Sequence, residues 1–176
     1  MRPDAITADD LLRGEHFTYF AYGSCMNLAS LSASLRCDAA PYFEGAARLD
    51  GHRLAFNYAS LNEPVCCANI EPAAGAIVEG ALYRLPMRML DALERREGVH
   101  LGRYVRCAVE VRESGGMRVH ALTYRGAVTL DCEAAPSVRY RDLLVRGLAD
   151  AGVSAAYRDR TVAYMAGLRD RPPEMQ

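Results

Sequence analysis

Residues 19–26, an aromatic stretch followed by a glycine and three more residues, constrain the fold of this chain more than any other feature. Its first part is rich in tyrosine and phenylalanine, a composition typical of a β-strand. Gly23 breaks that strand, and the residues after it are expected to begin a helix. The first turn of a helix presents backbone N–H groups without internal partners, together with partial positive charge. The segment therefore predicts either a carboxylate- or phosphate-binding turn or a plain strand-to-helix connection.

Length and charge limit the classes of protein that this chain can represent. A chain of 176 residues is long enough for one domain with a buried core, and we expect that domain over residues 16–168, with an N-terminal extension (1–15) and a C-terminal tail (169–176). The net charge of −1 provides no basic field for nucleic acid. No apolar run approaches the roughly 18 residues of a membrane span. Residues 1–10 lack the apolar core of a signal peptide, so we expect a cytoplasmic protein.

Hydrophobic periodicity predicts the order of the elements. Strands are expected over residues 16–21, 67–70 and 77–85, and two hairpins over 46–58, turning at Asp50-Gly51, and over 104–124, turning at residues 114–116. Helices are expected over residues 27–36, from Pro86 to Glu97, and through most of the chain from residue 137 to 168, with a break at Gly152. Strands thus cluster in the first three quarters of the chain and helices at its end, a pattern that predicts an α+β fold with a small antiparallel, barrel-like sheet and helices packed outside it.

Glu97 is the strongest candidate for proton transfer. It closes a predicted helix just before Gly98, where the negative end of the helix dipole disfavours a charged carboxylate. That position, with partial burial, would raise its pKa toward the range that suits a general acid and base. Alternatively, Glu97 is one solvated member of the charged run at residues 94–97.

The cysteines and histidines do not form a metal-binding pattern. No pair of the six cysteines has Cys-x-x-Cys spacing, and the four histidines are scattered, so a zinc site is not expected. Cys25 lies at the predicted helix start, where a thiol can become a nucleophile, or it simply fills a tight loop. Reduced thiols are the expected state of all six cysteines.

Two motifs together resemble the signatures of the γ-glutamylcyclotransferases. The segment Tyr22-Gly23-Ser24-Cys25 resembles the family's Tyr-Gly-Ser-Asn, and Leu93-x-x-x-Glu97-Gly98, followed by Tyr104, resembles its second signature. The strand around residues 80–83, Tyr124 and the segment 136–140 also resemble parts of that family. The resemblance runs in order over about nine-tenths of the chain.

The resemblance implies a fold, a reaction and roles for residues. The implied fold is a small, mixed, mostly antiparallel β-barrel with flanking α-helices, which in this family often forms a homodimer. The implied reaction releases 5-oxoproline and an amino acid or amine from a small γ-glutamyl substrate, without a cofactor. Glu97 would be the general acid and base, and the backbone of residues 23–26 would bind the substrate's α-carboxylate. The residues implied to contact substrate are Tyr22, Gly23, Ser24, Cys25, Met26, Tyr104, Tyr124 and Tyr140.

One departure from the family pattern keeps two alternatives open. Cys25 replaces the usual asparagine, so any hydrogen bond from that amide would be lost, because a thiol is a weak donor. The chain could instead be a Cys25-dependent amide hydrolase or acyl transferase. It could also be a non-catalytic module of the same fold that binds a small anion.

Overall fold

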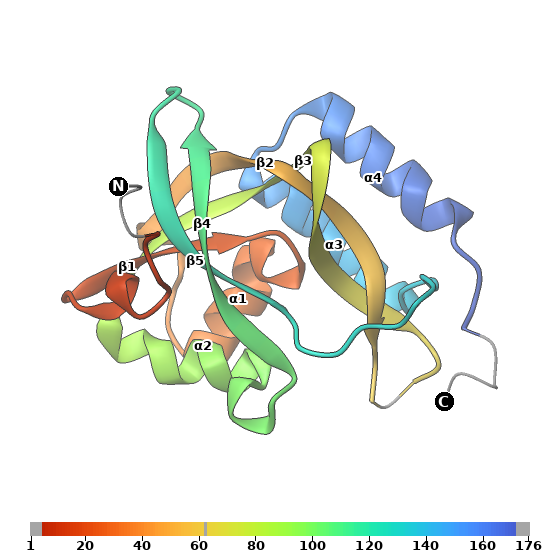
Figure 1. The fold of residues 1–176 in the computed structure, drawn as a ribbon, viewed down its shortest axis with the longest axis horizontal. Coiled ribbons are helices and arrows are strands. Elements are labelled where there is room, and N and C mark those ends of the chain that lie inside the picture. Colours follow the sequence, from red (N-terminus) through yellow and green to blue (C-terminus); the bar gives the residue numbers. More distant parts are fainter. Residues whose placement is uncertain (1–4, 62, 172–176) are drawn as a thin grey trace.

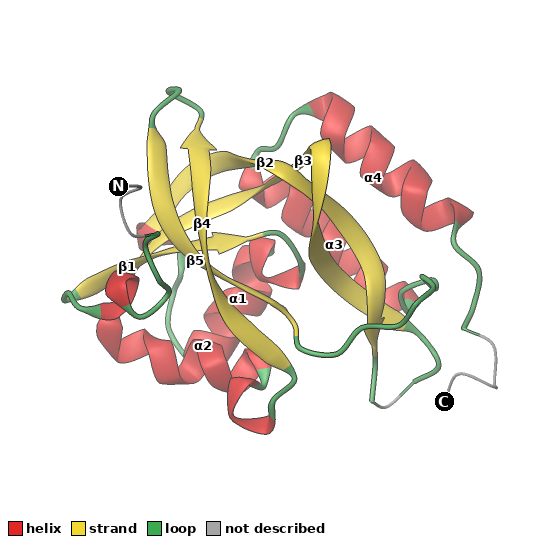
Figure 2. Cartoon of the chain, in the orientation of Figure 1, coloured by secondary structure: helices red, strands yellow, loops and turns green. Residues whose placement is uncertain are grey.

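A five-stranded closed barrel with α-helices packed outside it forms the core of the computed structural model, which describes residues 5–61 and 63–171. Figure 1 shows the long pair β2 and β3 crossing the molecule, with the β4–β5 hairpin beside it. The helices α1 and α2 lie together at one side, and α3 lies behind β2 and β3 with α4 next to it. This arrangement of helices and strands (Figure 2) confirms the α+β fold expected from the sequence.

The barrel closes through one parallel pair among antiparallel ones. The strand order is β1-β3-β2-β4-β5, and β5 returns to β1 in parallel, with Tyr19 opposite Leu122. All the other neighbours are antiparallel, so the barrel is mixed but mostly antiparallel, as the family resemblance implied. The strands are β1 (His16–Ala21), β2 (Phe43–Ala59), β3 (Cys66–Pro86), β4 (Tyr104–Glu113) and β5 (Arg118–Gly126).

The prediction of a hairpin over residues 46–58 is wrong. Residues on both sides of Asp50-Gly51 belong to the single strand β2, and the register with β3 shifts between Asp50 and His52. Gly51 has a φ of +72°, the left-handed conformation that a glycine supplies in a β-bulge as readily as in a turn. The dipeptide therefore bends the strand instead of reversing it.

The two strands expected over residues 67–70 and 77–85 are one strand, β3. Their separation nevertheless corresponds to a real irregularity, because Asp50 of β2 pairs with Ile77 whereas His52 pairs with Pro72. The β3 residues between these pairs, including Gly75 with a φ of +78°, have no partners in that register. Pro72 lies beside this irregularity, where a missing N–H costs little.

The other predicted elements are confirmed within a few residues. The strand over residues 16–21 and the 104–124 hairpin are present, and α2 ends at Glu97 with Gly98 in the left-handed conformation (φ +67°). Asn27 accepts a hydrogen bond from the N–H of Ser30 and so caps the start of α1. The helices are α1 (Leu28–Leu35), α2 (Leu90–Glu97), α3 (Val138–Ala151) and α4 (Ala155–Gly167).

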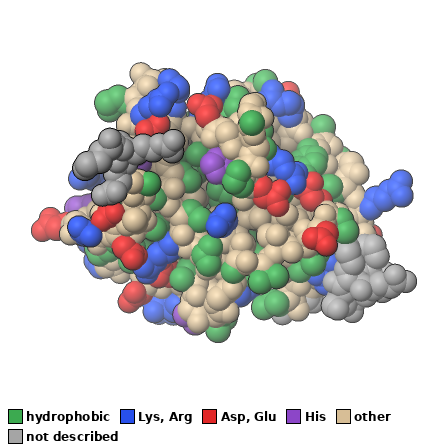
Figure 3. Space-filling view, viewed as in Figure 1, with side chains coloured by type: hydrophobic (Ala, Val, Ile, Leu, Met, Phe, Trp, Pro, Cys, Tyr) green, Lys and Arg blue, Asp and Glu red, His purple; other side chains and the backbone are tan. Residues whose placement is uncertain are grey.

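The core joins the barrel to the helices. Phe20 of β1, Leu82 of β3 and Leu122 of β5 are fully buried, and so are Leu93 of α2 and Leu144 of α3. Burial of each such side chain contributes about 1.5–3 kcal/mol relative to exposure. Acidic and basic side chains are interspersed over the face shown in Figure 3. The core thus fixes the ends of β1 and α2, from which the candidate site is built.

Parts of the predicted domain boundaries lie outside the described residues. Of the expected extension (1–15) and tail (169–176), residues 1–4 and 172–176 are not described, so these boundaries stay predictions. Among the helices of the described ranges, none is long and apolar enough to cross a lipid bilayer.

Candidate functional site

The chain turns sharply after β1. Gly23 precedes a 3-10 turn over Ser24–Met26, in which the N–H of Met26 donates to the Gly23 carbonyl at 3.0 Å. The N–H groups of Ser24 and Cys25 begin this turn and so have no partners within it. The backbone donors at this site therefore come from the 3-10 turn and not from the first turn of a helix.

The start of α1 is not the open anion-binding end that the sequence predicted. Asp150 of α3 accepts a hydrogen bond from the Leu28 N–H at 3.0 Å and another from the Asn27 side chain at 2.9 Å. A carboxylate of the protein therefore already occupies the positive end of this helix. Any substrate carboxylate at this site would have to bind the preceding turn.

Glu97 meets the turn from the opposite side. Its carboxylate oxygen Oε1 lies 3.3 Å from Cys25 Sγ and 3.5 Å from the Tyr19 hydroxyl, and both groups donate to it. Gly98 ends α2 immediately afterwards, with its N–H directed to the carbonyls of the last helical turn. The two signature segments, far apart in the sequence, therefore meet in space.

These groups surround a cavity of about 140 Å³. The volume is well below the roughly 300–1,000 Å³ of pockets for drug-sized ligands, so the cavity suits a small head group. Met26 is the exception among the predicted site residues: it is fully buried and does not line the cavity. The predicted residues that do line it are Tyr22, Gly23, Ser24, Cys25, Glu97, Tyr104, Tyr124 and Tyr140.

Six further residues line the cavity, and the sequence analysis did not predict any of them. Arg96 stands next to Glu97 in a run that reads as a solvated helix surface, and Tyr19 is one aromatic in a strand of several. Neither pattern could show which side chains turn inward. The six residues are Tyr19, Tyr58, Cys67, Ala68, Arg96 and Arg103.

Three of the tyrosine hydroxyls around the cavity hold its walls together. Tyr22 donates to the Tyr124 carbonyl at 2.6 Å, and Tyr104 donates to the Ala68 carbonyl at 2.9 Å. The Tyr124 hydroxyl donates to Glu94 at 3.2 Å. These three side chains shape the cavity while their hydroxyl protons are already engaged.

The Tyr140 hydroxyl is bound differently. It accepts a hydrogen bond from the Ala68 N–H at 3.2 Å, and within the described part of the chain its own proton has no recorded acceptor. A Cβ atom built on Gly23 would lie 3.1 Å from this hydroxyl. Tyr140 therefore brings a free donor close to the turn.

Burial dominates the electrostatics of Glu97. Its side chain is partly accessible through the cavity but surrounded by protein, and this desolvation raises its pKa. The positive charge of Arg96 and the hydrogen bonds from Cys25 and Tyr19 act in the opposite direction without cancelling the effect. The result is a carboxyl group adjusted toward accepting and returning a proton.

Cys25 is placed as a hydrogen-bond donor rather than as a nucleophile. Burial raises the pKa of its thiol to about 12, although the charge of Arg96 opposes this. At neutral pH the thiol is protonated, whereas thiol nucleophiles react as thiolates. The environment of Cys25 therefore argues against covalent catalysis through sulfur.

Arg103 supplies a second cation at the rim of the cavity. Its Nε donates to the Tyr58 hydroxyl at 3.1 Å, and its guanidinium carbon lies 5.7 Å from the centre of the Tyr58 ring. Two glycines make room for this pair: a Cβ on Gly98 would lie 2.7 Å from the Arg103 stem, and one on Gly126 would lie 2.8 Å from the Tyr58 ring. The pair is thus held in a fixed position.

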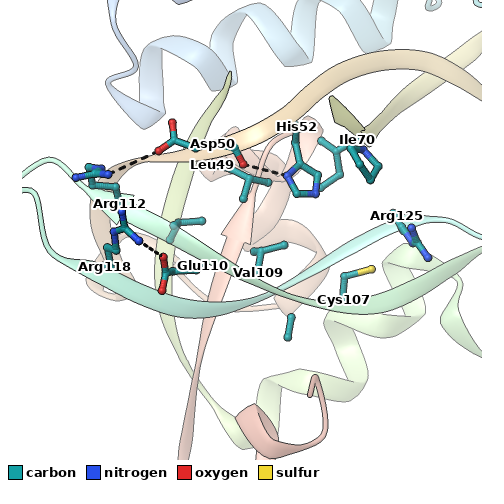
Figure 4. Close-up of a pocket in the computed structure, with 13 residues that line it drawn as sticks. Leu49, Asp50, His52, Ile70, Cys107, Val109, Glu110, Arg112, Arg118 and Arg125 are labelled. Atoms are coloured by element: carbon teal, nitrogen blue, oxygen red, sulfur yellow. Dashed lines mark hydrogen bonds and ion pairs between the residues drawn. The ribbon is translucent and has the colours of Figure 1, made fainter. Parts of the chain in front are cut away.

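Two larger hollows are present, one away from the small cavity and one adjoining it. One, of about 520 Å³, lies between β2 and β4, and two of its arginines form ion pairs there, Arg118 with Glu110 at 2.9 Å (Figure 4) and Arg112 with Asp50 at 3.8 Å. The other is a groove of about 1,170 Å³ that shares Cys67, Arg96 and Tyr140 with the small cavity. Within residues 5–61 and 63–171, no cluster of three or more His, Cys, Asp or Glu side chains could hold a metal ion.

Comparisons with a family model, with known sequences and with solved structures find similar proteins of related description. A family model described as the AIG2-like family matches residues 77–160, which include Glu97 and Tyr140. The γ-glutamylcyclotransferases of Homo sapiens and Mus musculus are 29% and 30% identical over 85% of this chain, and the alignments cover 79% of each relative. The crystal structure of YkqA from Bacillus subtilis is 29% identical, with a TM-score of 0.80 over 89% of this chain and 56% of its own.

Proposed function

This chain belongs to the γ-glutamylcyclotransferase family, and from that premise we propose that it cyclises the γ-glutamyl group of a small γ-glutamyl amide. The products are 5-oxoproline and the amine or amino acid that formed the amide. The observation that carries this proposal is the 3.3 Å contact between Cys25 Sγ and Glu97 Oε1, because it joins both signature segments at one cavity.

The glutamyl head is proposed to bind groups that have no other hydrogen-bond acceptor within residues 5–61 and 63–171. The α-carboxylate is proposed to accept hydrogen bonds from the N–H groups of Ser24 and Cys25 at the start of the 3-10 turn. The Tyr140 hydroxyl supplies a further donor beside Gly23. The remaining tyrosines line the cavity and exclude water, which strengthens these polar contacts.

The chemical step is an intramolecular acyl transfer. The α-amine nitrogen attacks the γ-carbonyl carbon, a new C–N bond closes the five-membered ring, and the original amide C–N bond breaks. Glu97 takes one proton from the α-ammonium group and delivers it to the departing nitrogen. The second proton, which the α-nitrogen loses on ring closure, leaves with the released amine as its ammonium form, so no water is consumed. A suitably oriented intramolecular attack gains about 7–11 kcal/mol. General acid–base catalysis typically adds a factor of about 10²–10⁴.

The leaving group is proposed to lie toward the adjoining groove. This groove shares Cys67, Arg96 and Tyr140 with the cavity and is much larger, about 1,170 Å³ against about 140 Å³. The small cavity would thus read the common glutamyl head, while the groove would receive the variable part. Homodimer formation, which the family resemblance implied, stays a prediction.

The two alternative functions make different predictions. A Cys25-dependent hydrolase would need a thiolate, yet the pKa of this thiol is about 12. A non-catalytic anion-binding module would need no proton carrier, yet the carboxyl group of Glu97 is buried beside the turn at a cost in desolvation. Both observations favour the cyclotransferase.

The test is a product analysis on a panel of γ-glutamyl amides whose leaving groups range from ammonia and simple amines to amino acids and bulky amines. We expect 5-oxoproline and the free leaving group in equal amounts. Release of glutamate would instead support hydrolysis. Binding of 5-oxoproline without turnover of any member of the panel would support the anion-binding module.

A further inference from the structure

Arg96 connects the two halves of the candidate site. It directly precedes Glu97 on α2, and its guanidinium reaches across to both the 3-10 turn and α1. We propose that Arg96 is a positioning residue that fastens the anion-binding turn through Ser24 and at the same time places a positive charge beside Glu97. This inference rests on the proposed function, since it assigns a task to Arg96 in that same reaction.

Both terminal nitrogens of Arg96 are fully committed. Nη2 donates to Ser24 Oγ at 2.9 Å and to Ser30 Oγ at 3.0 Å. Nη1 donates to the Ser30 carbonyl at 2.8 Å and to Ser34 Oγ at 2.6 Å. Four acceptors therefore fix the plane of the guanidinium, and one of them belongs to the turn.

Helix α1 presents serine side chains where the guanidinium of Arg96 needs acceptors. Ser30 and Ser34 are four positions apart, so their hydroxyls lie on one face of the helix, toward α2. A guanidinium is a planar fork that can hold acceptors on two sides at once, whereas a lysine ammonium is a single point of charge. An arginine can thus join the turn to α1, which a lysine would do incompletely.

The charge of Arg96 acts on the proton carrier. The groups facing Glu97 are Tyr19 from β1, Cys25 from the turn and Arg103 from the segment before β4, besides Arg96 itself. All four lower the pKa of Glu97 against the larger effect of burial, and Arg96 has the largest share among them. Without Arg96, Glu97 would be protonated over a wider range of pH, so a smaller fraction of the enzyme would hold the ionised carboxylate that acts as the base.

Three variants separate the two tasks. Ser24→Ala removes the hydrogen bond from Arg96 to the turn but keeps the charge of Arg96. KM for a γ-glutamyl amide should therefore rise by about tenfold, while the acidic limb of the pH profile of kcat/KM stays in place. Arg96→Met removes both tasks, so KM should rise and the limb should move up by about half a pH unit or more. Arg96→Lys should return the limb toward its original position while KM stays raised.

The matched control is Arg95→Met. Arg95 is the exposed neighbour of Arg96 on α2, and its substitution should change neither KM nor the limb. An Arg96→Met profile with an unmoved limb, or a Ser24→Ala enzyme with unchanged KM, would overturn the proposal. If Arg96→Met does not fold, as judged by its thermal unfolding, the Ser24→Ala and Arg96→Lys results decide.

Failure of the proposed function can be told apart from failure of this inference. A wild-type protein that releases no 5-oxoproline from any amide refutes the function alone. The pKa of Glu97 is then followed by NMR on protein labelled with ¹³C at the glutamate carboxyl groups, and 5-oxoproline binding by calorimetry. Arg96→Met should raise that pKa and weaken binding about tenfold; an unchanged pKa and unchanged binding would refute the role of Arg96.

Discussion

The thiol of Cys25 donates a hydrogen bond to the carboxylate of Glu97 across 3.3 Å, although the two residues are 72 positions apart. The contact requires both the 3-10 turn after β1 and the end of α2 to be in place. Each segment alone permits an ordinary structural interpretation, a turn in one case and a charged helix surface in the other. Their meeting at a small cavity supports the chemical role proposed for both.

Replacement of Glu97 by glutamine is predicted to stabilise the protein at neutral pH. Burial raises the pKa of Glu97 in the folded chain above the ordinary value of about 4.3 that it keeps when unfolded. The stability from this group is therefore fully present below the unfolded pKa and is lost as pH rises through the folded pKa. Glutamine has no such loss, so Glu97→Gln should raise the Tm at pH 7, with a smaller gain at pH 4.

Thermal unfolding followed by circular dichroism at both pH values checks this prediction. Glu110→Gln, an exposed position on β4, serves as the control for loss of one carboxylate. A Glu97→Gln protein no more stable than wild type at pH 7 would mean that the desolvation cost is absent.

Removal of the Cys25 thiol is predicted to leave 5-oxoproline formation within about tenfold of wild type, since the lost bond from a neutral donor is a weak one. The thiol is protonated at neutral pH, and its backbone N–H survives in Cys25→Ala. Product analysis by chromatography checks this outcome. Complete loss of turnover in Cys25→Ala would revive the thiol-dependent hydrolase.

A methyl group on Gly23 is predicted to weaken substrate binding while the fold stays intact. The added Cβ would lie 3.1 Å from the Tyr140 hydroxyl, so that this donor must move. We expect Gly23→Ala to raise KM several-fold with a change in the free energy of unfolding below about 1 kcal/mol. The control is Gly115→Ala, because a Cβ there would meet nothing within 4 Å. Equal KM values for the two variants would exclude Tyr140 from the binding site.

A methyl group on Gly80 is predicted to damage the barrel itself. It would lie 2.2 Å from the backbone oxygen of Ala21, at the end of the β1–β3 pair just before the turn. Overpacking of this kind costs about 1–3 kcal/mol, and here the obstacle is backbone, which yields less than a side chain. Urea denaturation of Gly80→Ala should show this loss, and a midpoint equal to that of Gly115→Ala would contradict it.

The sequence predicted best what local patterns determine. Alternation identified the β4–β5 hairpin, and Gly98 marked the end of α2, because both signals depend on neighbouring residues. Asp50-Gly51 misled the prediction, since a glycine with positive φ serves a bulge as well as a turn, and only the pairing with β3 decides between them.

The sequence indicated the two motifs of the candidate site, but not the residues from other elements that complete its cavity. Glu97 and the Gly23 turn belong to recognisable motifs, whereas Arg96 and Tyr58 reach the cavity only because distant elements pack together. Asp150 is a second example of a contact that the sequence did not reveal. Its carboxylate occupies the start of α1 from a helix more than a hundred residues later, which no local pattern could indicate.

The most direct measurement is the product balance of wild type and Glu97→Gln with a γ-glutamyl amide that the wild type accepts. The wild type should release 5-oxoproline and the leaving group in equal amounts. Glu97→Gln should fold, bind 5-oxoproline and turn over at least about a hundredfold more slowly, since it can neither take nor return the proton. A Glu97→Gln protein that forms 5-oxoproline at the wild-type rate would contradict the account.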